Sequence, residues 1–409
     1  MFEKKNNYPV VLVPGIIGSF APGAKRTIEG LGTECFTPSF CLLSGVWNRA
    51  CELYAQIKGG VVDYGAAHSN AFGTERYGNS YEGFYPEWGE KDKNGKTKKI
   101  TIIAHGYGAT VARLLAHLMK NGASSEKEYR QEGVSPLFEG GHDGAIHCIV
   151  TLGGLNDGTT LFQALEGTFP GSMMKLTKAA FLLDAKNPCP YGKAIHFSLP
   201  EDLKNPKHLL RFDEDIIERY NLQLGDNVFH TSGLDSMEEF NSMVENSPST
   251  YYIAYTGEVT KNYMDYIPDK PLLVQKNPLK LGKHENPLTA KRSYDNSSRR
   301  DITLPAKEAG LTALTSALIG RYTNYIKGQP LVDEAAHPND GIVNTNSSLV
   351  PSTEELVYFT YPEDCIKGEW VQMPIERKNH FEYLGFLVSP DKYYNRVFDL
   401  LKIICNLED

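Results

Sequence analysis

The segment with the clearest chemical pattern is 103–110, which reads Ile-Ala-His-Gly-Tyr-Gly-Ala-Thr. A β-branched apolar run precedes it, and apolar residues spaced three and four apart follow it as far as Gly122, which predicts a strand turning directly into a helix. This pattern is typical of a nucleophile elbow, where a serine at the apex attacks a carbonyl and small residues flank it two places away. Ala104 and Gly108 are the small residues here. Gly106 stands at the apex, so the scaffold for acyl transfer lacks its hydroxyl.

Two residues far downstream could handle protons at such a turn. Asp340 lies in Asn-Asp-Gly-Ile-Val, which predicts an acid in a tight turn entering a strand, and His380 lies on a loop ahead of the last apolar helix. Enzymes with this elbow carry nucleophile, acid and histidine in that chain order. We therefore expect Asp340 to orient His380, and His380 to exchange a proton with the reacting group.

A glycine-containing loop near the amino terminus could stabilise a developing negative charge. Pro14-Gly-Ile-Ile-Gly18 directly follows an apolar strand, and such loops aim main-chain N–H groups at an oxyanion. We expect the donors to be the backbone amides of Ile16 and Tyr107. The Tyr107 side chain should point away from the site, and His105 should be a packing residue.

The elements that must position these residues indicate an α/β fold. Short, almost wholly apolar runs alternate with helical stretches, which predicts a mostly parallel central sheet with helices on both faces. The clearest predicted strands are Val10–Val13, Ile100–Ala104, Cys148–Leu152 and Tyr251–Tyr255. We expect one domain over residues 1–409, with an inserted helical lid at about 160–250. The apolar stripe near Met173 fits either such a lid or ordinary core.

Composition narrows the partners and the compartment. The 409 residues carry a net charge of −8, which argues against a nucleic-acid partner and fits uncharged or cationic small substrates. No apolar run is long enough to span a membrane. The seven cysteines lack metal-binding spacing and favour reduced thiols. These features fit a cytoplasmic protein, or a secreted one whose leader has been removed.

At this point the sequence resembles the thermostable Bacillus-type and staphylococcal lipases and their plant and protist relatives. The resemblance implies an α/β-hydrolase fold, a lid that opens at a lipid interface, and hydrolysis of long-chain acyl esters. It also implies a small apolar or acyl-chain ligand. Nothing in the sequence suggests a phosphate loop or a redox cofactor. The matching segments include 11–18, 47–56, 59–68, 85–88, 135–142, 157–160, 339–345 and His380.

The chain departs from that family at its metal sites as well as at Gly106. The family's zinc site uses two aspartates and two histidines, of which only His68 matches, because Asn48 and Thr74 replace two of the others. One imidazole does not hold zinc, so we expect none. The family's calcium site would use Glu382 and a nearby aspartate; with Ser-Pro-Asp391 there, calcium stays open, and no cofactor is required.

Three explanations of Gly106 remain open at this stage. The glycine could be a deliberate inactivation in a lipase or carboxylesterase lineage. It could be natural, with the pair His380–Asp340 serving as a general base in a lyase, isomerase or cyclase. The chain could also be a ligand-binding pseudoenzyme. In each case the chain as written should be a very poor ester hydrolase, because loss of the nucleophile typically costs about 10⁶ in turnover.

Overall fold

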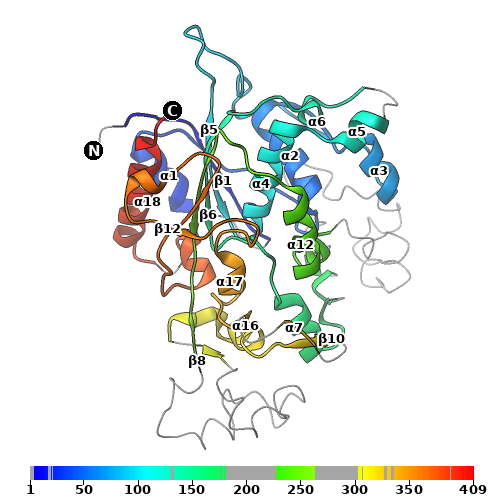
Figure 1. Cartoon of the computed structure of the whole chain (residues 1–409), viewed down its shortest axis with the longest axis vertical. Coiled ribbons are helices and arrows are strands. Elements are labelled where there is room, and N and C mark those ends of the chain that lie inside the picture. The colour runs from blue at the N-terminus through cyan, green and yellow to red at the C-terminus, as the bar shows by residue number, and fades with distance from the viewer. Residues whose placement is uncertain are drawn as a thin grey trace, which may run out of the picture.

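A parallel sheet runs through the centre of the molecule (Figure 1). The computed structural model describes residues 4–16, 20, 22–129, 133–173, 175–177, 179–180, 227–262, 303–305, 307–326, 329–332, 336–386 and 388–409. Within them, seven strands lie in the order β12-β13-β7-β6-β5-β1-β2, and every neighbouring pair is parallel. Their bounds are Val357–Tyr358, Trp370–Gln372, Tyr251–Tyr255, Ile146–Leu152, Ile100–His105, Val10–Val13 and Cys35–Phe36.

The apolar strands pack on both faces of this sheet, as the sequence predicts. Successive side chains of a strand point to opposite faces. Val10 and Leu12 accordingly belong to one core cluster, whereas Val11 and Val13 belong to another. The predicted strands at 10–13 and 251–255 are confirmed at both ends, and the other two extend by one or two residues.

Helices cover the two faces of the sheet separately (Figure 1). On one face lie α1 (Pro22–Gly30) and α18 (Pro390–Asn406), and on the other lie α2 (Val46–Lys58) and α4 (Tyr107–Asn121). The remaining helical elements with assigned bounds are α3 (Ala66–Phe72), α5 (Ser124–Tyr129), α6 (Pro136–Glu139), α7 (Leu161–Thr168), α11 (Val228–Thr231), α12 (Leu234–Met243), η2 (Lys307–Thr312), α16 (Ala313–Ile319), α17 (Thr345–Ser348), η4 (Pro362–Asp364) and η5 (His380–Leu384).

Among the described residues, three antiparallel strand pairs lie outside the central sheet. They are β3 (Gly60–Asp63) with β4 (Tyr77–Tyr81), β8 (Thr260–Asn262) with β9 (Thr303–Pro305), and β10 (Asn324–Ile326) with β11 (Gln329–Val332). The last two pairs lie on the same side of the molecule as α7 and α16 (Figure 1).

The segment predicted as a lid is described only in part. Residues 181–226 lie outside the described residues. At its carboxyl end, Val228, Met237 and Phe240 are buried in the same core cluster as α4. A movable lid at 160–250, and a single domain over 1–409, stay predictions.

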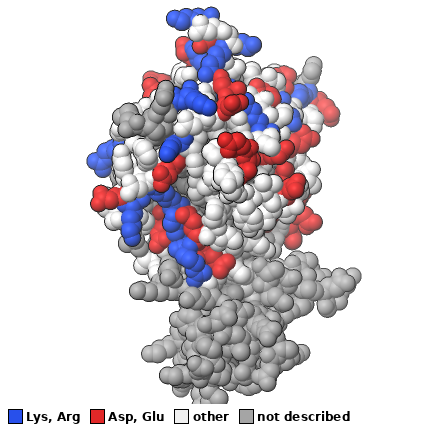
Figure 2. Space-filling model, turned by 60° about the vertical axis from the view of Figure 1, so that its left-hand side comes forward, with Lys and Arg blue, Asp and Glu red and all other residues white. Residues whose placement is uncertain are grey.

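The surface shows no large field of one charge on the face seen in Figure 2, where basic and acidic side chains are intermixed. In the part of the chain that the structure describes, no helix is both long enough and apolar enough to cross a bilayer. The thiols of Cys35, Cys148, Cys365 and Cys405 are free, as expected of reduced cysteines.

Candidate functional site

The predicted site residues gather at one edge of the sheet. Because the strands are parallel, their carboxyl ends lie along a common edge, where ligands of open α/β sheets bind. A glycine follows each of four neighbouring strands there: Gly15 after β1, Gly106 after β5, Gly153 after β6 and Gly257 after β7. At this edge the four strands are therefore followed by main chain without side chains, which leaves room for the other site residues.

Gly106 is the apex of the predicted strand-turn-helix. It has φ 52° and ψ −122°, a conformation that costs a residue with a side chain about 1–3 kcal/mol and glycine little. Its N–H donates to the carbonyl of Leu152 at 3.1 Å, and its own carbonyl accepts from the N–H of Ala109 at 3.0 Å. The small residue at 108 is also explained, since a β-carbon there would lie 2.6 Å from the carbonyl oxygen of Val13.

Asp340 and His380 form a buried pair beside this apex. His380 Nδ1 lies 2.7 Å from Asp340 Oδ2, and the two residues are 5% and 0% exposed. The other carboxylate oxygen accepts from the N–H groups of Ile342 and Val343 at 2.9 and 2.8 Å. A β-carbon built on Gly106 would lie 2.9 Å from His380 Nε2. The structure thus brings all three predicted residues together.

The local structure around the pair differs from the predicted one. The turn at Asp340 leads through an isolated bridge into α17 rather than into a strand. The reason is that the side chains of Asn339 and Asp340 accept from the N–H groups of residues 341–343, which uses up the donors a strand would need. His380 likewise begins the short helix η5, capped by the side chain of Asn379.

His105 is the packing residue that the sequence predicts. It is fully buried, its Nε2 donates to the main-chain carbonyl of His380 at 2.9 Å, and the two ring centroids lie 4.1 Å apart. Burial, followed by the nearby charge of His380, holds the pKa of His105 well below its usual value. His105 therefore stays neutral and fixes the backbone from which the His380 ring projects.

Arg49, which the sequence reasoning missed, orients the loop that carries Ile16. The buried guanidinium donates to the carbonyl of Gly15 at 3.0 Å and to three carbonyls of the segment 41–44. The Gly15 carbonyl and the Ile16 N–H belong to one trans peptide and point in opposite directions. By holding the Gly15 carbonyl, Arg49 therefore fixes the direction in which the Ile16 N–H points. The sequence signal is weak, because the same helix also carries the polar residues Asn48, Glu52 and Gln56.

Tyr107 lies on the same network. Its main-chain N would be 3.7 Å from a β-carbon on Gly15, so the two predicted oxyanion donors lie close together. Its buried ring lies 5.2 Å from the guanidinium carbon of Arg49, and its hydroxyl is hydrogen-bonded to Thr231 Oγ1. The ring thus points away from the apex, as predicted. The oxyanion role of Ile16 and Tyr107 stays a prediction.

His68, the one residue that matches the family's zinc ligands, packs among aromatic rings. His68 is stacked against Trp47, with centroids 5.2 Å apart, and packs against Phe72. Among the residues described, no group of three or more His, Cys, Asp or Glu side chains gathers to hold a metal ion. Glu382 lies in η5, two residues from His380. The absence of zinc and the open question of calcium at Glu382 both stay predictions.

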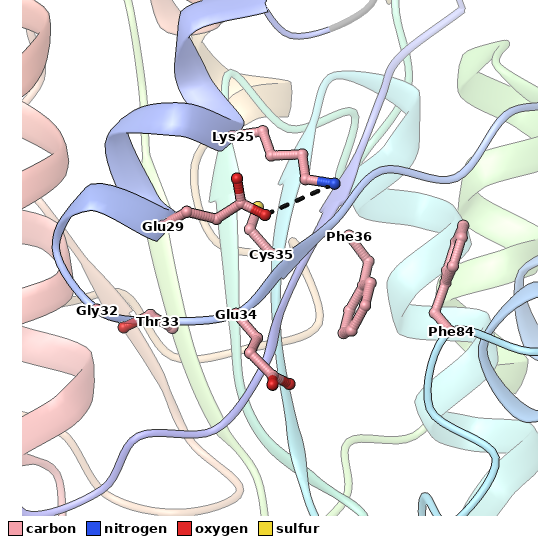
Figure 3. Close-up of a pocket in the computed structure, with 8 residues that line it drawn as sticks. All are labelled: Lys25, Glu29, Gly32, Thr33, Glu34, Cys35, Phe36 and Phe84. Carbon is pink, nitrogen blue, oxygen red and sulfur yellow. Dashed lines mark ion pairs between the residues drawn. The ribbon is translucent and has the colours of Figure 1, made fainter.

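A surface pocket of about 540 Å³ lies elsewhere, between α1 and the edge strand β2 (Figure 3). Lys25 and Glu29 form an ion pair of 3.6 Å at its rim, and the rings of Phe36 and Phe84 stack with centroids 5.3 Å apart. None of its lining residues is Gly106, Asp340 or His380. The pocket is therefore not the site at the carboxyl edge.

Known sequences similar to this chain are lipases and lipase-like proteins. The family model described as "Lipase-like, C-terminal domain" matches residues 6–272. The chain belongs to this family. A Staphylococcus epidermidis lipase is 31% identical over 402 residues, which cover 94% of this chain and 51% of that protein. Lipase 2 of Staphylococcus aureus is 28% identical over 408 residues, with 93% and 50% covered. The chain thus spans about half the length of these relatives.

Solved structures share the α/β-hydrolase fold. EstA from Clostridium botulinum is 28% identical with a TM-score of 0.70, covering 100% of this chain and 89% of that one. Lipase 1 from Pelosinus fermentans is 27% identical with a TM-score of 0.69, covering 99% and 100%. The lipase of Staphylococcus hyicus, 24% identical with a TM-score of 0.73 and 98% and 97% covered, supports the fold alone.

Proposed function

We propose that this lipase-like chain receives an ester with an apolar acyl group at the carboxyl edge of its sheet, and that it hydrolyses that ester very weakly. The observation that supports this best is the distance from His380 Nε2 to the β-carbon position of Gly106, 2.9 Å. The proton acceptor is aimed at the place where the family's hydroxyl would stand, and no hydroxyl is there.

Four further residues are suited to the two tasks of acyl transfer, which are stabilising the oxyanion and transferring protons. The amides of Ile16 and Tyr107 would donate to the carbonyl oxygen as it gains charge, which is where preorganised donors act most strongly. His380 would accept and return a proton, and Asp340 would hold its Nδ1–H and favour the imidazolium form. Without the nucleophile, turnover should fall by about 10⁶, and roughly 10³–10⁴ over water should remain.

A second candidate is a reaction that needs only the base, such as a proton abstraction, elimination or isomerisation. It is favoured by the state of the Asp340–His380 pair, which is buried and hydrogen-bonded through both carboxylate oxygens. The desolvation of a buried charged pair can cost more than the pairing returns, so a pair without a function is expected to be lost. If the chain is instead a pseudoenzyme that only binds an apolar ligand, His380→Ala should leave the affinity for that ligand nearly unchanged.

The test is the steady-state hydrolysis of p-nitrophenyl butyrate by the chain, by Gly106→Ser and by Gly106→Ser/His380→Ala. We expect Gly106→Ser to raise kcat/KM by several orders of magnitude, and the second substitution to remove that gain. The rate of Gly106→Ser should stay below that of an evolved lipase, because a β-carbon 2.9 Å from Nε2 forces the imidazole to shift by a few tenths of an ångström. A folded Gly106→Ser variant as slow as the chain itself overturns the proposal.

A further inference from the structure

We propose that water takes the place of the absent serine hydroxyl, and that His380 activates this water to attack the ester directly. The chain would then hydrolyse activated esters, such as aryl esters, in one displacement without an acyl-enzyme. This inference rests on the proposed function, because it uses the same site and the same ester class.

The apex at Gly106 lies against the edge of the His380 imidazole, where a small oxygen nucleophile can reach Nε2. The nearest atoms to a β-carbon at Gly106 are His380 Nε2 at 2.9 Å, His380 Cε1 at 3.2 Å and Gly15 Cα at 3.9 Å. Outside residues 105–107, the next atom after the imidazole edge is therefore glycine main chain at ordinary van der Waals distance. A water placed just outside the apex reaches Nε2 at hydrogen-bond distance, typically about 2.7–3.0 Å.

The protonation of His380 suits this role. Asp340 Oδ2 lies 2.7 Å from Nδ1, and a carboxylate only accepts, so the ring proton is held on Nδ1. The Nε2 lone pair is then the free acceptor, and it faces the apex. A general base needs both this tautomer and this reach.

The polar side chains of Tyr107 and His105, on either side of Gly106, are hydrogen-bonded to other groups. The hydroxyl of Tyr107 is hydrogen-bonded to Thr231, whose own hydroxyl donates to the carbonyl of Asn227 at 2.8 Å. His105 donates its Nε2–H to the carbonyl of His380. Since Tyr107 and His105 are hydrogen-bonded to other partners, we take the nucleophile nearest the base to be a solvent water.

The proposed step balances without any further reagent. The water oxygen bonds to the ester carbonyl carbon while one of its protons passes to His380 Nε2. The carbonyl oxygen becomes an alkoxide that accepts from the amides of Ile16 and Tyr107. When the carbon–oxygen double bond re-forms, the ester C–O bond breaks, and the leaving alkoxide takes the proton from His380. The products are one carboxylic acid and one alcohol.

The test compares p-nitrophenyl butyrate hydrolysis by the chain, by His380→Ala and by Gly106→Ala, each checked for folding by circular dichroism. General-base catalysis is typically worth about 10²–10⁴, so the chain should exceed His380→Ala by about 10² or more. Gly106→Ala should fall to the same level, because its methyl group would lie 2.9 Å from Nε2 and block the water's approach to it. Product release should be linear from the first turnover, and intact mass spectrometry should show no acyl adduct.

The outcomes separate this inference from the proposed function. A chain no faster than His380→Ala overturns the water mechanism, and Gly106→Ser tested alongside it then decides whether the lipase-like machinery is intact. A faster chain that carries an acyl adduct also overturns it, because some side chain would then be the nucleophile. If Gly106→Ala is unstable, the comparison with His380→Ala and the adduct measurement still decide the question.

Discussion

Asp340 and His380 are joined by two hydrogen bonds, one between their side chains at 2.7 Å and one from the His380 N–H to the Asp340 carbonyl at 3.0 Å. The two residues are 40 positions apart, so this double link ties together the turn before α17 and the start of η5. The main-chain link does not depend on the ionisation of either side chain. The geometry of the pair is therefore maintained in a chain with glycine at the apex of the turn.

Asp340→Asn should disable the base while leaving the fold in place. The main-chain bond to His380 persists, but an amide no longer holds the proton on Nδ1, and the corresponding change in serine-hydrolase triads lowers kcat by about 10⁴. We expect a loss approaching that size when the substitution is made in the Gly106→Ser variant and measured with p-nitrophenyl butyrate. The exposed Asp235→Asn is the control and should have no effect. A loss below tenfold for Asp340→Asn would count against its assigned role.

Gly153→Ala should damage the pair without touching either member. Gly153 has φ 55°, and a β-carbon there would lie 3.0 Å from Asp340 Oδ2 and 3.1 Å from His380 Nδ1. The added methyl group is strained by about 1–3 kcal/mol and presses on the hydrogen bond itself. Urea denaturation should show a lower free energy of unfolding.

The matched control is Gly167→Ala in α7, where a β-carbon meets nothing within 4 Å. Alanine there should be neutral or stabilise by about 0.5–1 kcal/mol, because it favours the helix. Equal stability of the Gly153→Ala and Gly167→Ala variants would contradict the close packing of Gly153 against the pair.

Replacing Arg49 should weaken oxyanion stabilisation. Arg49→Met leaves the Gly15 carbonyl and its neighbours without their donor, at a cost of about 1–3 kcal/mol per buried group. In the Gly106→Ser variant, kcat should fall by up to about 10², the lower end of what losing one oxyanion donor costs, with KM little changed. Arg49→Lys should recover part of the rate, since an ammonium can still reach one carbonyl. A rise in KM with kcat intact would instead indicate a role in binding.

Buried histidines should make the protein less stable in mild acid. Burial lowers the pKa of His147 to about 4, so the native state stays neutral at pH 5 while the unfolded chain takes up a proton near pH 6.5. Stability is therefore highest above pH 6.5 and is lost as the pH falls towards 4, by on the order of 3 kcal/mol from this residue. His105 acts in the same direction.

His147→Gln tests this dependence. Glutamine can still donate to the carbonyl of Ile404, which His147 Nε2 contacts at 3.3 Å, but it does not titrate. Between pH 7.5 and pH 5, the free energy of unfolding measured in urea should fall less for His147→Gln than for the unsubstituted protein. The exposed His230→Gln is the control. An unchanged decline in His147→Gln would contradict the assignment.

Local sequence patterns predict the framework of this site well. The apolar β-branched run and the helical repeat on either side of Gly106 depend on neighbours along the chain, so the elbow is recognisable from sequence. The order of Gly106, Asp340 and His380 adds a constraint that few other residues satisfy.

The unpredicted features depend on contacts between distant segments. Nothing in the sequence near Arg49 indicates that its acceptor is the Gly15 carbonyl. Likewise, the sequence around Gly153 does not show that Asp340 packs against this glycine. The strand expected after Asp340 is missing because side-chain oxygens take the local N–H groups, an outcome that apolar periodicity does not register.

The most direct test of the central claim is a rapid-mixing experiment on Gly106→Ser with excess p-nitrophenyl butyrate. The claim is that the proton-handling pair still converges on the apex, so a hydroxyl restored there should become acylated. We expect a burst of about one equivalent of p-nitrophenolate per folded chain, absent from the chain itself and from Gly106→Ser/His380→Ala. A folded Gly106→Ser variant that gives neither a burst nor an acyl adduct would show that the pair does not act on the apex.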